Sequence, residues 1–271
     1  MQQTQLSAEE KWELATLANN FIFYKVMRHH QDACRRLIEM LLNIKIEKME
    51  MSNEEVIEVD FDSKGIRLDV FVKDSKKIYD IELQITNTKE LPERARYYQG
   101  LMDLDTLKSG QKYKELKDSH VIFICMEDIF DNNLPVCTFE NICLEDKITK
   151  LNDRAYKHFF ITPHCVKMIK DKEVKSFFEL LISNTAKTSF TSELKDYVSD
   201  AKHNMQWRVQ FMTWERQRAY DFDDGKEAGI AIGEQQKAIE TAKNALALNL
   251  SAEQVSKITG LPLEKIVELQ A

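Results

Sequence analysis

Residues 65–85 read GIRLDVFVKDSKKIYDIELQI, and the fold follows from this stretch. Apolar and polar residues alternate on both sides of the polar segment KDSKK, which predicts two strands joined as a β-hairpin. To bury the apolar residues of both strands on one face, an even-numbered position must pair with an odd-numbered one. A turn centred near Ser75 and Lys76 satisfies this condition, and it pairs Asp69 with Glu82.

The same register brings polar side chains together on the face away from the apolar layer. Asp69 lies opposite Glu82, and Gln84 shares their face because strand side chains alternate with a period of two. Opposed Cβ atoms are about 4.5–5.5 Å apart, and two carboxylates at that distance repel each other unless a cation lies between them. The pattern therefore permits a site for a hard divalent cation such as Mg²⁺. The alternative, an ordinary solvated hairpin face, stays open at this point.

The rest of the chain supplies helices around these strands. The middle of the chain has the order helix, three strands, helix, strand, and the chain is helical again towards its C-terminus. The predicted elements are a helical region at 8–46, a strand at 56–61, the hairpin, a helix from Pro92 to about Leu107, a buried strand at 121–126 and helices from about residue 171.

Composition narrows the class of protein. With 43% hydrophobic and 31% charged residues, the chain of 271 residues is not mainly disordered. The longest apolar run, 121–126, is far shorter than the roughly 20 residues of a membrane helix, and no secretory signal is visible. Five Cys without a CxxC pair, and six His without metal-ligand spacing, indicate reduced thiols and no zinc site. We therefore expect a cytoplasmic protein that does not enter a membrane.

The charge is unevenly distributed along the chain. The net charge of −7 disfavours a polyanionic partner, because phosphate binding requires Lys and Arg. Residues 64–117, however, contain 12 Lys and Arg against nine Asp and Glu. This basic middle permits a nucleic-acid site without demonstrating one.

The hairpin and the segments that follow it resemble a known family. Together with the element order, the stretches LPERARYYQGLMDLDTL, KYKELKDSHVIFICMEDIF and NDRAYKHFF resemble the PD-(D/E)XK nuclease family transposases, the recombination-promoting nuclease (Rpn) family. The likeness covers roughly residues 15–220. It implies an α/β fold, a restriction-endonuclease-like αβββαβ core with a mixed central sheet, followed by a helical C-terminal extension.

The resemblance also assigns roles to the acidic residues. It makes Asp69 and Glu82 catalytic residues that hold the metal. Gln84 stands where the broader superfamily has Lys, and Gln is the usual residue at this position in the nearer family. Gln could orient a water molecule or a phosphate oxygen, but it cannot supply positive charge. Glu39 falls where many nucleases of the superfamily carry an auxiliary acid. Its alternative role is that of a solvent-facing helix residue.

The helix after the hairpin carries the candidate DNA contacts, namely Arg94, Arg96, Tyr98 and Gln99. Arg suits bidentate phosphate contact and Tyr can stack on bases. Arg94 and Tyr98 lie one helical turn apart on one face. The alternative is that the Arg side chains form surface ion pairs and the Tyr side chains pack the helix on the sheet. For Tyr97 we expect the packing role.

The function that the resemblance implies is Mg²⁺-dependent hydrolysis of DNA phosphodiester bonds, in recombination, mobile-element biology or defence. The alternative is a degenerate nuclease fold that binds DNA or oligomerises without turnover. We predict a nuclease-like core at 1–170, a helical extension on or near it at 171–225 and a helical tail at 226–271. Gly225, Gly229 and Gly233 predict a linker or stalk before two short C-terminal helices, which suit homo-oligomerisation better than DNA reading.

Overall fold

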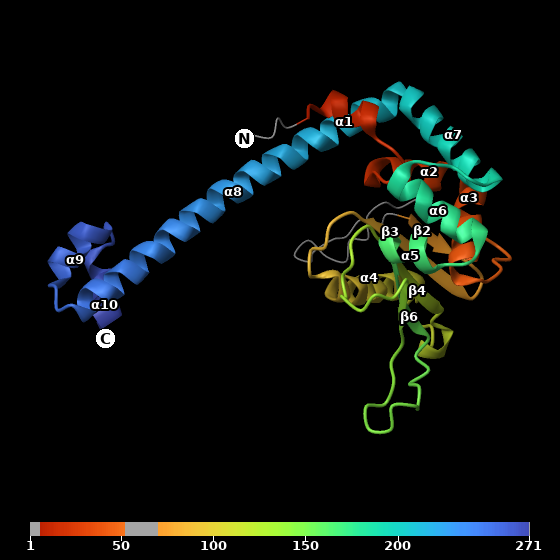
Figure 1. Cartoon of the computed structure of the whole chain (residues 1–271). Coiled ribbons are helices and arrows are strands. Elements are labelled where there is room, and N and C mark those ends of the chain that lie inside the picture. The colour runs from red at the N-terminus through yellow and green to blue at the C-terminus, as the bar shows by residue number, and fades with distance from the viewer. Residues whose placement is uncertain (1–5, 52–69, 271) are drawn as a thin grey trace. The chain divides into compact units, whose positions relative to one another are not determined.

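The protein, seen here as a computed structural model, is described at residues 6–51 and 70–270 (Figure 1). The chain divides into two compact units, residues 1–208 and 209–271. The predicted domain boundaries at 170 and 225 remain predictions. No helix in the described part has the long apolar run that crossing a membrane requires.

The N-terminal helical region consists of separate helices, α1 (Ala8–Leu14), α2 (Asn20–His29) and α3 (Gln31–Leu42). Ser7 caps α1 in a reciprocal capping box with Glu10. The Asn19 side chain accepts a hydrogen bond from the backbone N–H of Ile22 and starts α2. These caps explain why the region at 8–46 is not one continuous helix.

A mixed sheet of six strands forms the centre of the first unit within the described residues. Its strands are β1 (Glu50–Met51), β2 (Val70–Lys73), β3 (Lys77–Gln84), β4 (Asp118–Cys125), β5 (Val136–Phe139) and β6 (Ala155–Ile161). The spatial order is β1-β2-β3-β4-β6-β5, with β3, β4 and β6 parallel and the remaining neighbours antiparallel. The predicted α/β fold with a mixed central sheet is therefore confirmed.

The hairpin has the predicted register. Val70 pairs with Ile81 and Val72 pairs with Tyr79, so even positions face odd ones. Asp69 and the strand predicted at 56–61 lie outside the described residues.

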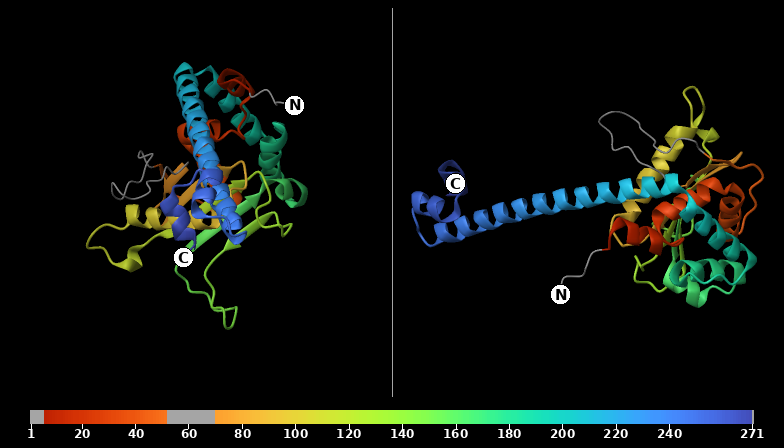
Figure 2. Two further views of the ribbon diagram at one scale, coloured as in Figure 1. Left: turned by 90° about the vertical axis from the view of Figure 1, so that its left-hand side faces the viewer. Right: turned by 90° about the horizontal axis from the view of Figure 1, so that it is seen from above.

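Helices cover both faces of this sheet (Figure 1; Figure 2). On one face, α4 (Leu91–Thr106) packs its side chains Ala95, Tyr98 and Met102 against Phe123 and Phe159 in a single apolar cluster. On the other face, α2 contacts β2 and β3. The predicted helix start at Pro92 is confirmed, because this proline lies in the first turn of α4.

The remaining elements of the first unit are short. They are the 3₁₀ turn Tyr113–Glu115 and the helices α5 (Thr162–Met168), α6 (Lys172–Ser183) and α7 (Ser189–His203). Between β5 and β6 the chain forms a long hairpin loop that projects from the sheet, with a β-bridge between Ile142 and Lys150 (Figure 1; Figure 2, left).

The second unit contains most of α8 (Met205–Ala247) together with α9 (Ala252–Thr259) and α10 (Leu263–Gln270). Ala242, Ala245, Val255 and Ile266 form its apolar core. The predicted capping box at Ser251 is present, and Gly260 ends α9 in the left-handed conformation, with a φ of 73°. The two predicted C-terminal helices are thus confirmed.

The glycines of α8 do not interrupt the helix, and the linker or stalk expected there remains a prediction. A Cβ atom added at Gly225, Gly229 or Gly233 would meet no atom within 4 Å. Replacing all three with Ala should therefore stabilise α8 by about 0.5–1 kcal/mol per site, because Ala loses less backbone entropy than Gly. Circular dichroism should show higher helicity at a given temperature. Lower helicity would contradict a continuous helix here.

Two histidines are buried together on the face of the sheet opposite to α4. His120 Nδ1 lies 3.1 Å from His158 Nε2, and the His120 ring is stacked between Tyr79 and Tyr156. Burial lowers the pKa of His120 to about 3, with His158 and Lys77 contributing. Burial also lowers the pKa of His158 to about 4. Both rings are therefore neutral at pH 7.

This pair predicts a pH dependence of folding. Since the unfolded chain binds protons near the ordinary pKa of 6.5 and the folded chain does so only near 3–4, the free energy of unfolding should fall as the pH drops from 6.5 towards 4. His120→Phe keeps an aromatic ring in the stack and removes one titrating group. As the pH is lowered, the free energy of unfolding of this variant, measured with urea, should therefore decrease less steeply than that of the wild type. The difference in slope should be up to about 1.4 kcal/mol per pH unit. Equal slopes would refute the assignment.

Candidate active site

The side chains of Asp80, Glu82 and Gln84 lie on the face of β3 that α4 covers. Asp80 is fully buried and Glu82 is 4% exposed. As predicted, this face is opposite to the one that carries Ile81 and Leu83, but it is not an ordinary solvated face, because α4 places a second apolar layer on it. Two carboxylates consequently lie two residues apart on one strand in a region of low dielectric.

Arg94 connects the side chains of this site. Its Nη1 donates to Gln84 Oε1 at 2.9 Å, and its Nη2 donates to the Tyr98 hydroxyl at 2.9 Å. The same Nη2 lies 3.5 Å from Glu82 Oε2, so the guanidinium also forms an ion pair with the buried carboxylate. The Arg94 guanidinium thus connects the strand residues Glu82 and Gln84 with the helix residue Tyr98.

The amide of Gln84 is engaged at both ends. Its oxygen accepts from Arg94, and its Nε2 donates to the backbone carbonyl of Thr86 at 2.6 Å. Each end keeps further hydrogen-bonding capacity, one acceptor site on the oxygen and one N–H on the nitrogen. Gln84 is therefore held in place and still able to bind a water molecule or a phosphate oxygen.

Tyr98 is buried, and Tyr97 is 40% exposed, which reverses the expectation that Tyr97 packs in the core. The stripe of α4 that faces the sheet contains Leu91, Ala95, Tyr98 and Met102, at spacings of three and four. Burial raises the pKa of Tyr98 to about 12, and the Glu82 carboxylate adds to this rise. The phenol is thus protonated at neutral pH.

The predicted DNA contacts of α4 lie in different surroundings. Arg94 and Tyr98 adjoin Glu82, and Arg96 is exposed. Gln99 is buried, donates to Ser119 Oγ at 3.0 Å and accepts from Lys157 Nζ at 2.6 Å. The structure therefore brings Arg94 and Tyr98 to the acidic group and places Gln99 towards β6. Contact of these residues with DNA remains a prediction.

Glu39 binds the segment that follows its own helix. Its carboxylate accepts hydrogen bonds from the backbone N–H of Ile46 and from Lys45 Nζ, both at 2.9 Å. Burial tends to raise the pKa of Glu39, but these two bonds and the Lys45 charge leave it lower than usual. An ionised Glu39 thus fixes the end of α3, and its auxiliary role in catalysis remains a prediction.

The donor set of the described residues fits a hard cation in chemical type. The Glu82 carboxylate and the Gln84 amide supply oxygen atoms, the ligands that Mg²⁺ prefers. Within residues 6–51 and 70–270, no three His, Cys, Asp or Glu side chains are grouped as a metal site would require. The other predicted ligand, Asp69, lies outside these residues.

Sequence reasoning missed Asp80 and the bond between Arg94 and Gln84. Asp80 could have been found from the sequence, because it lies two residues before Glu82 in an alternating strand and therefore points to the same face. The Arg94 bond joins positions 10 residues apart across a loop, and no local spacing rule predicts it.

Comparison with known families agrees with this geometry. The family model for the PD-(D/E)XK nuclease family transposases matches residues 20–220. The chain belongs to this family. No curated protein and no solved structure matches the chain. Membership confirms the resemblance drawn from the sequence and supports a nuclease-type function in general.

Proposed function

We propose that the chain is a metal-dependent endonuclease that hydrolyses phosphodiester bonds of DNA. The observation that carries this proposal is the buried Glu82 carboxylate, grouped with Gln84 and Arg94, in a member of a nuclease family. A solvated hairpin face would not need a buried acid with its own guanidinium partner. Such groups are expensive to bury, and they concentrate at functional sites.

In this proposal Glu82 and Asp69 hold a divalent cation, Mg²⁺ by preference. When bound, the ion would lower the pKa of water and stabilise charge on the phosphoryl group. Gln84 orients the attacking water or a phosphate oxygen through the hydrogen-bonding capacity it has left. Glu39 assists as an auxiliary acid.

Arg94 supplies the positive charge that Gln84 lacks. Its guanidinium lies against both Gln84 and Glu82, so it can stabilise negative charge that develops on the phosphate. Arg96, Tyr98 and Gln99 complete the proposed DNA contacts, with exposed Arg96 suited to a backbone phosphate. We place the activity in the cytoplasm, in recombination, mobile-element biology or defence.

We assign self-association to the C-terminal helices. Ile258, Leu263 and Val267 are large apolar side chains exposed on α9 and α10. A second copy of the chain could bury them.

A second candidate function is DNA binding or oligomerisation without turnover. The ion pair between Arg94 and Glu82 favours it, because this pair compensates the buried charge without any metal. The two candidates differ in their need for a cation at Glu82.

Calorimetric titration of the whole protein with Mg²⁺ and with Ca²⁺ tests the proposal. The wild type should bind one of these ions measurably, and Glu82→Gln should bind it at least about tenfold more weakly, because a charged ligand is lost. Equal binding by the two proteins, or none by either, would reject a metal site at Glu82 and favour the non-catalytic candidate.

A further inference from the structure

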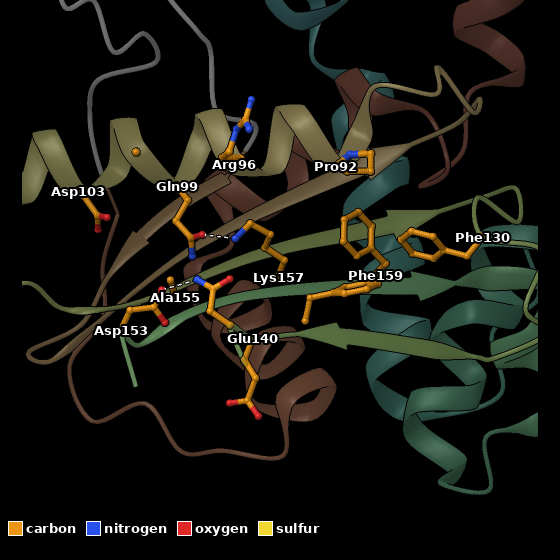
Figure 3. A pocket seen from close by; sticks show the side chains of 13 residues that line it. Pro92, Arg96, Gln99, Asp103, Phe130, Glu140, Asp153, Ala155, Lys157 and Phe159 are labelled. Atoms are coloured by element: carbon orange, nitrogen blue, oxygen red, sulfur yellow. Dashed lines mark hydrogen bonds between the residues drawn. The ribbon is translucent and has the colours of Figure 1, made fainter. Parts of the chain in front are cut away.

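A cavity of about 740 Å³ opens between α4 and β6 (Figure 3). Since β4 separates β3 from β6 in the sheet, this cavity and Glu82 lie on opposite sides of α4. Its volume lies within the range of small-molecule sites, about 300–1,000 Å³. None of the roles proposed for Glu82 and Arg94 uses this cavity.

One end of the cavity is aromatic. Phe159 is buried at its base, and the rings of Phe130 and Phe139 meet it edge to face, with centroids at 5.1 and 5.7 Å. Phe139 is 45% exposed although it belongs to a strand. Such a corner suits the flat apolar faces of a ring system, which can pack against aromatic side chains.

The other end of the cavity is polar and contains free hydrogen-bonding capacity. The half-buried Asp103 carboxylate accepts no hydrogen bond from a described residue, and burial, then the nearby Asp153, raise its pKa. Lys157 Nζ donates to Gln99 Oε1 at 2.6 Å, which leaves two of its three N–H groups available. Asn141 fixes Asp153 through a bond of 2.6 Å. Acceptor oxygens therefore lie beside an ammonium donor.

This combination selects among ligands. The carboxylates of Asp103 and Asp153 disfavour a phosphate inside the cavity, and Lys157 disfavours a simple cation, whereas the Glu140 carboxylate is paired with Lys150. The remaining fit is a neutral, planar ring with N–H donors for a carboxylate and a carbonyl oxygen for the lysine. Among the common bases, guanine carries two adjacent donors beside a carbonyl oxygen, whereas adenine and cytosine offer one amino group next to a ring acceptor.

We propose that this cavity binds a guanine base, either from a free guanine nucleotide or from an unpaired guanine in nucleic acid. The base packs in the corner of Phe130, Phe139 and Phe159. Its donor edge binds Asp103 and its carbonyl oxygen binds Lys157. Exposed Arg96 at the rim binds the phosphate of the same nucleotide. The proposal does not depend on cleavage at Glu82.

Calorimetric titration of the full chain with GMP, AMP, CMP and UMP tests it. GMP should bind at least about tenfold more tightly than the others, and Asp103→Asn should weaken it by about tenfold or more, as expected for a lost bond to a charged group. Phe139→Ala, at an exposed position, should also weaken it. Glu93→Gln, the same chemical change on an exposed part of α4 outside the cavity, should not.

The competing outcomes are distinct. Equal affinity for GMP and AMP, or no binding of any of the four nucleotides, would overturn the proposal. Binding of spermidine that Asp103→Asn abolishes, without binding of GMP, would overturn it in favour of a cation site. Circular dichroism of each variant checks that the fold is retained.

A second pair of ligands identifies the source of the base. A DNA hairpin with one unpaired guanine should bind more tightly than the same hairpin with an unpaired adenine, in a manner that needs Asp103. If this hairpin also binds more tightly than GMP, the base comes from nucleic acid, and the reverse order indicates a free nucleotide. Equal binding of both hairpins, unaffected by Asp103→Asn, would exclude nucleic acid as the source of the base, and the GMP titration then decides whether the cavity binds guanine at all.

Discussion

Replacing Glu82 with Gln is expected to lower the rate of Mg²⁺-dependent DNA cleavage by at least about 100-fold, the usual loss when one group that stabilises transition-state charge is removed. Glu82 is the acidic ligand of the proposed site that the structure describes, and Gln keeps its shape while removing its charge. The fold should persist, because the buried side chain is replaced by one of equal size. Rates of plasmid nicking, measured beside circular dichroism spectra, check both parts.

The matched control is Glu93→Gln. Glu93 lies exposed on α4, so the same loss of charge occurs away from the buried group. Its cleavage rate should stay within about twofold of the wild type, since surface substitutions away from special features have small effects. An unchanged rate in Glu82→Gln would remove this residue from the proposed mechanism.

Replacing Arg94 with Ala should reduce both stability and cleavage. The Glu82 side chain is only 6% exposed, so losing its cation leaves a nearly buried charge without compensation. Because the Arg94 side chain is itself 30% exposed, we expect a loss of about 1–3 kcal/mol, below the value for fully buried pairs. Gln84 and Tyr98 also lose a donor. Urea unfolding at pH 7 measures the stability change.

A double-mutant cycle isolates the cause of this effect. In Glu82→Gln the carboxylate charge is already absent, so adding Arg94→Ala should cost about 1 kcal/mol less than it does in the wild type. Strict additivity of the two substitutions would show that Arg94 acts through packing rather than through charge.

The hairpin was predictable from sequence because its information is local. Alternation on both sides of a short turn leaves one register that buries both apolar sets, and pairs such as Val70 with Ile81 have that register. The helix start at Pro92 and the capping box at Ser251 are equally local signals.

The surroundings of the site were not predictable in the same way. Whether Glu82 faces water depends on α4, because this helix covers the face of the sheet that carries Glu82. The side of α4 that packs on the sheet includes Tyr98 rather than Tyr97. The burial of Glu82 and its contact with Arg94 arise from tertiary packing. Short elements such as β1 and β5 also carry too few residues for a period to appear.

The most direct test of the cleavage proposal is incubation of the purified full chain with supercoiled plasmid, with Mg²⁺ or with a chelator, beside Asp69→Ala and Glu82→Gln. The account predicts that the wild type nicks or linearises the plasmid with Mg²⁺ but not with the chelator, and that both variants lose this activity. Plasmid left intact at high protein concentration, or cleavage that survives both substitutions, would contradict it.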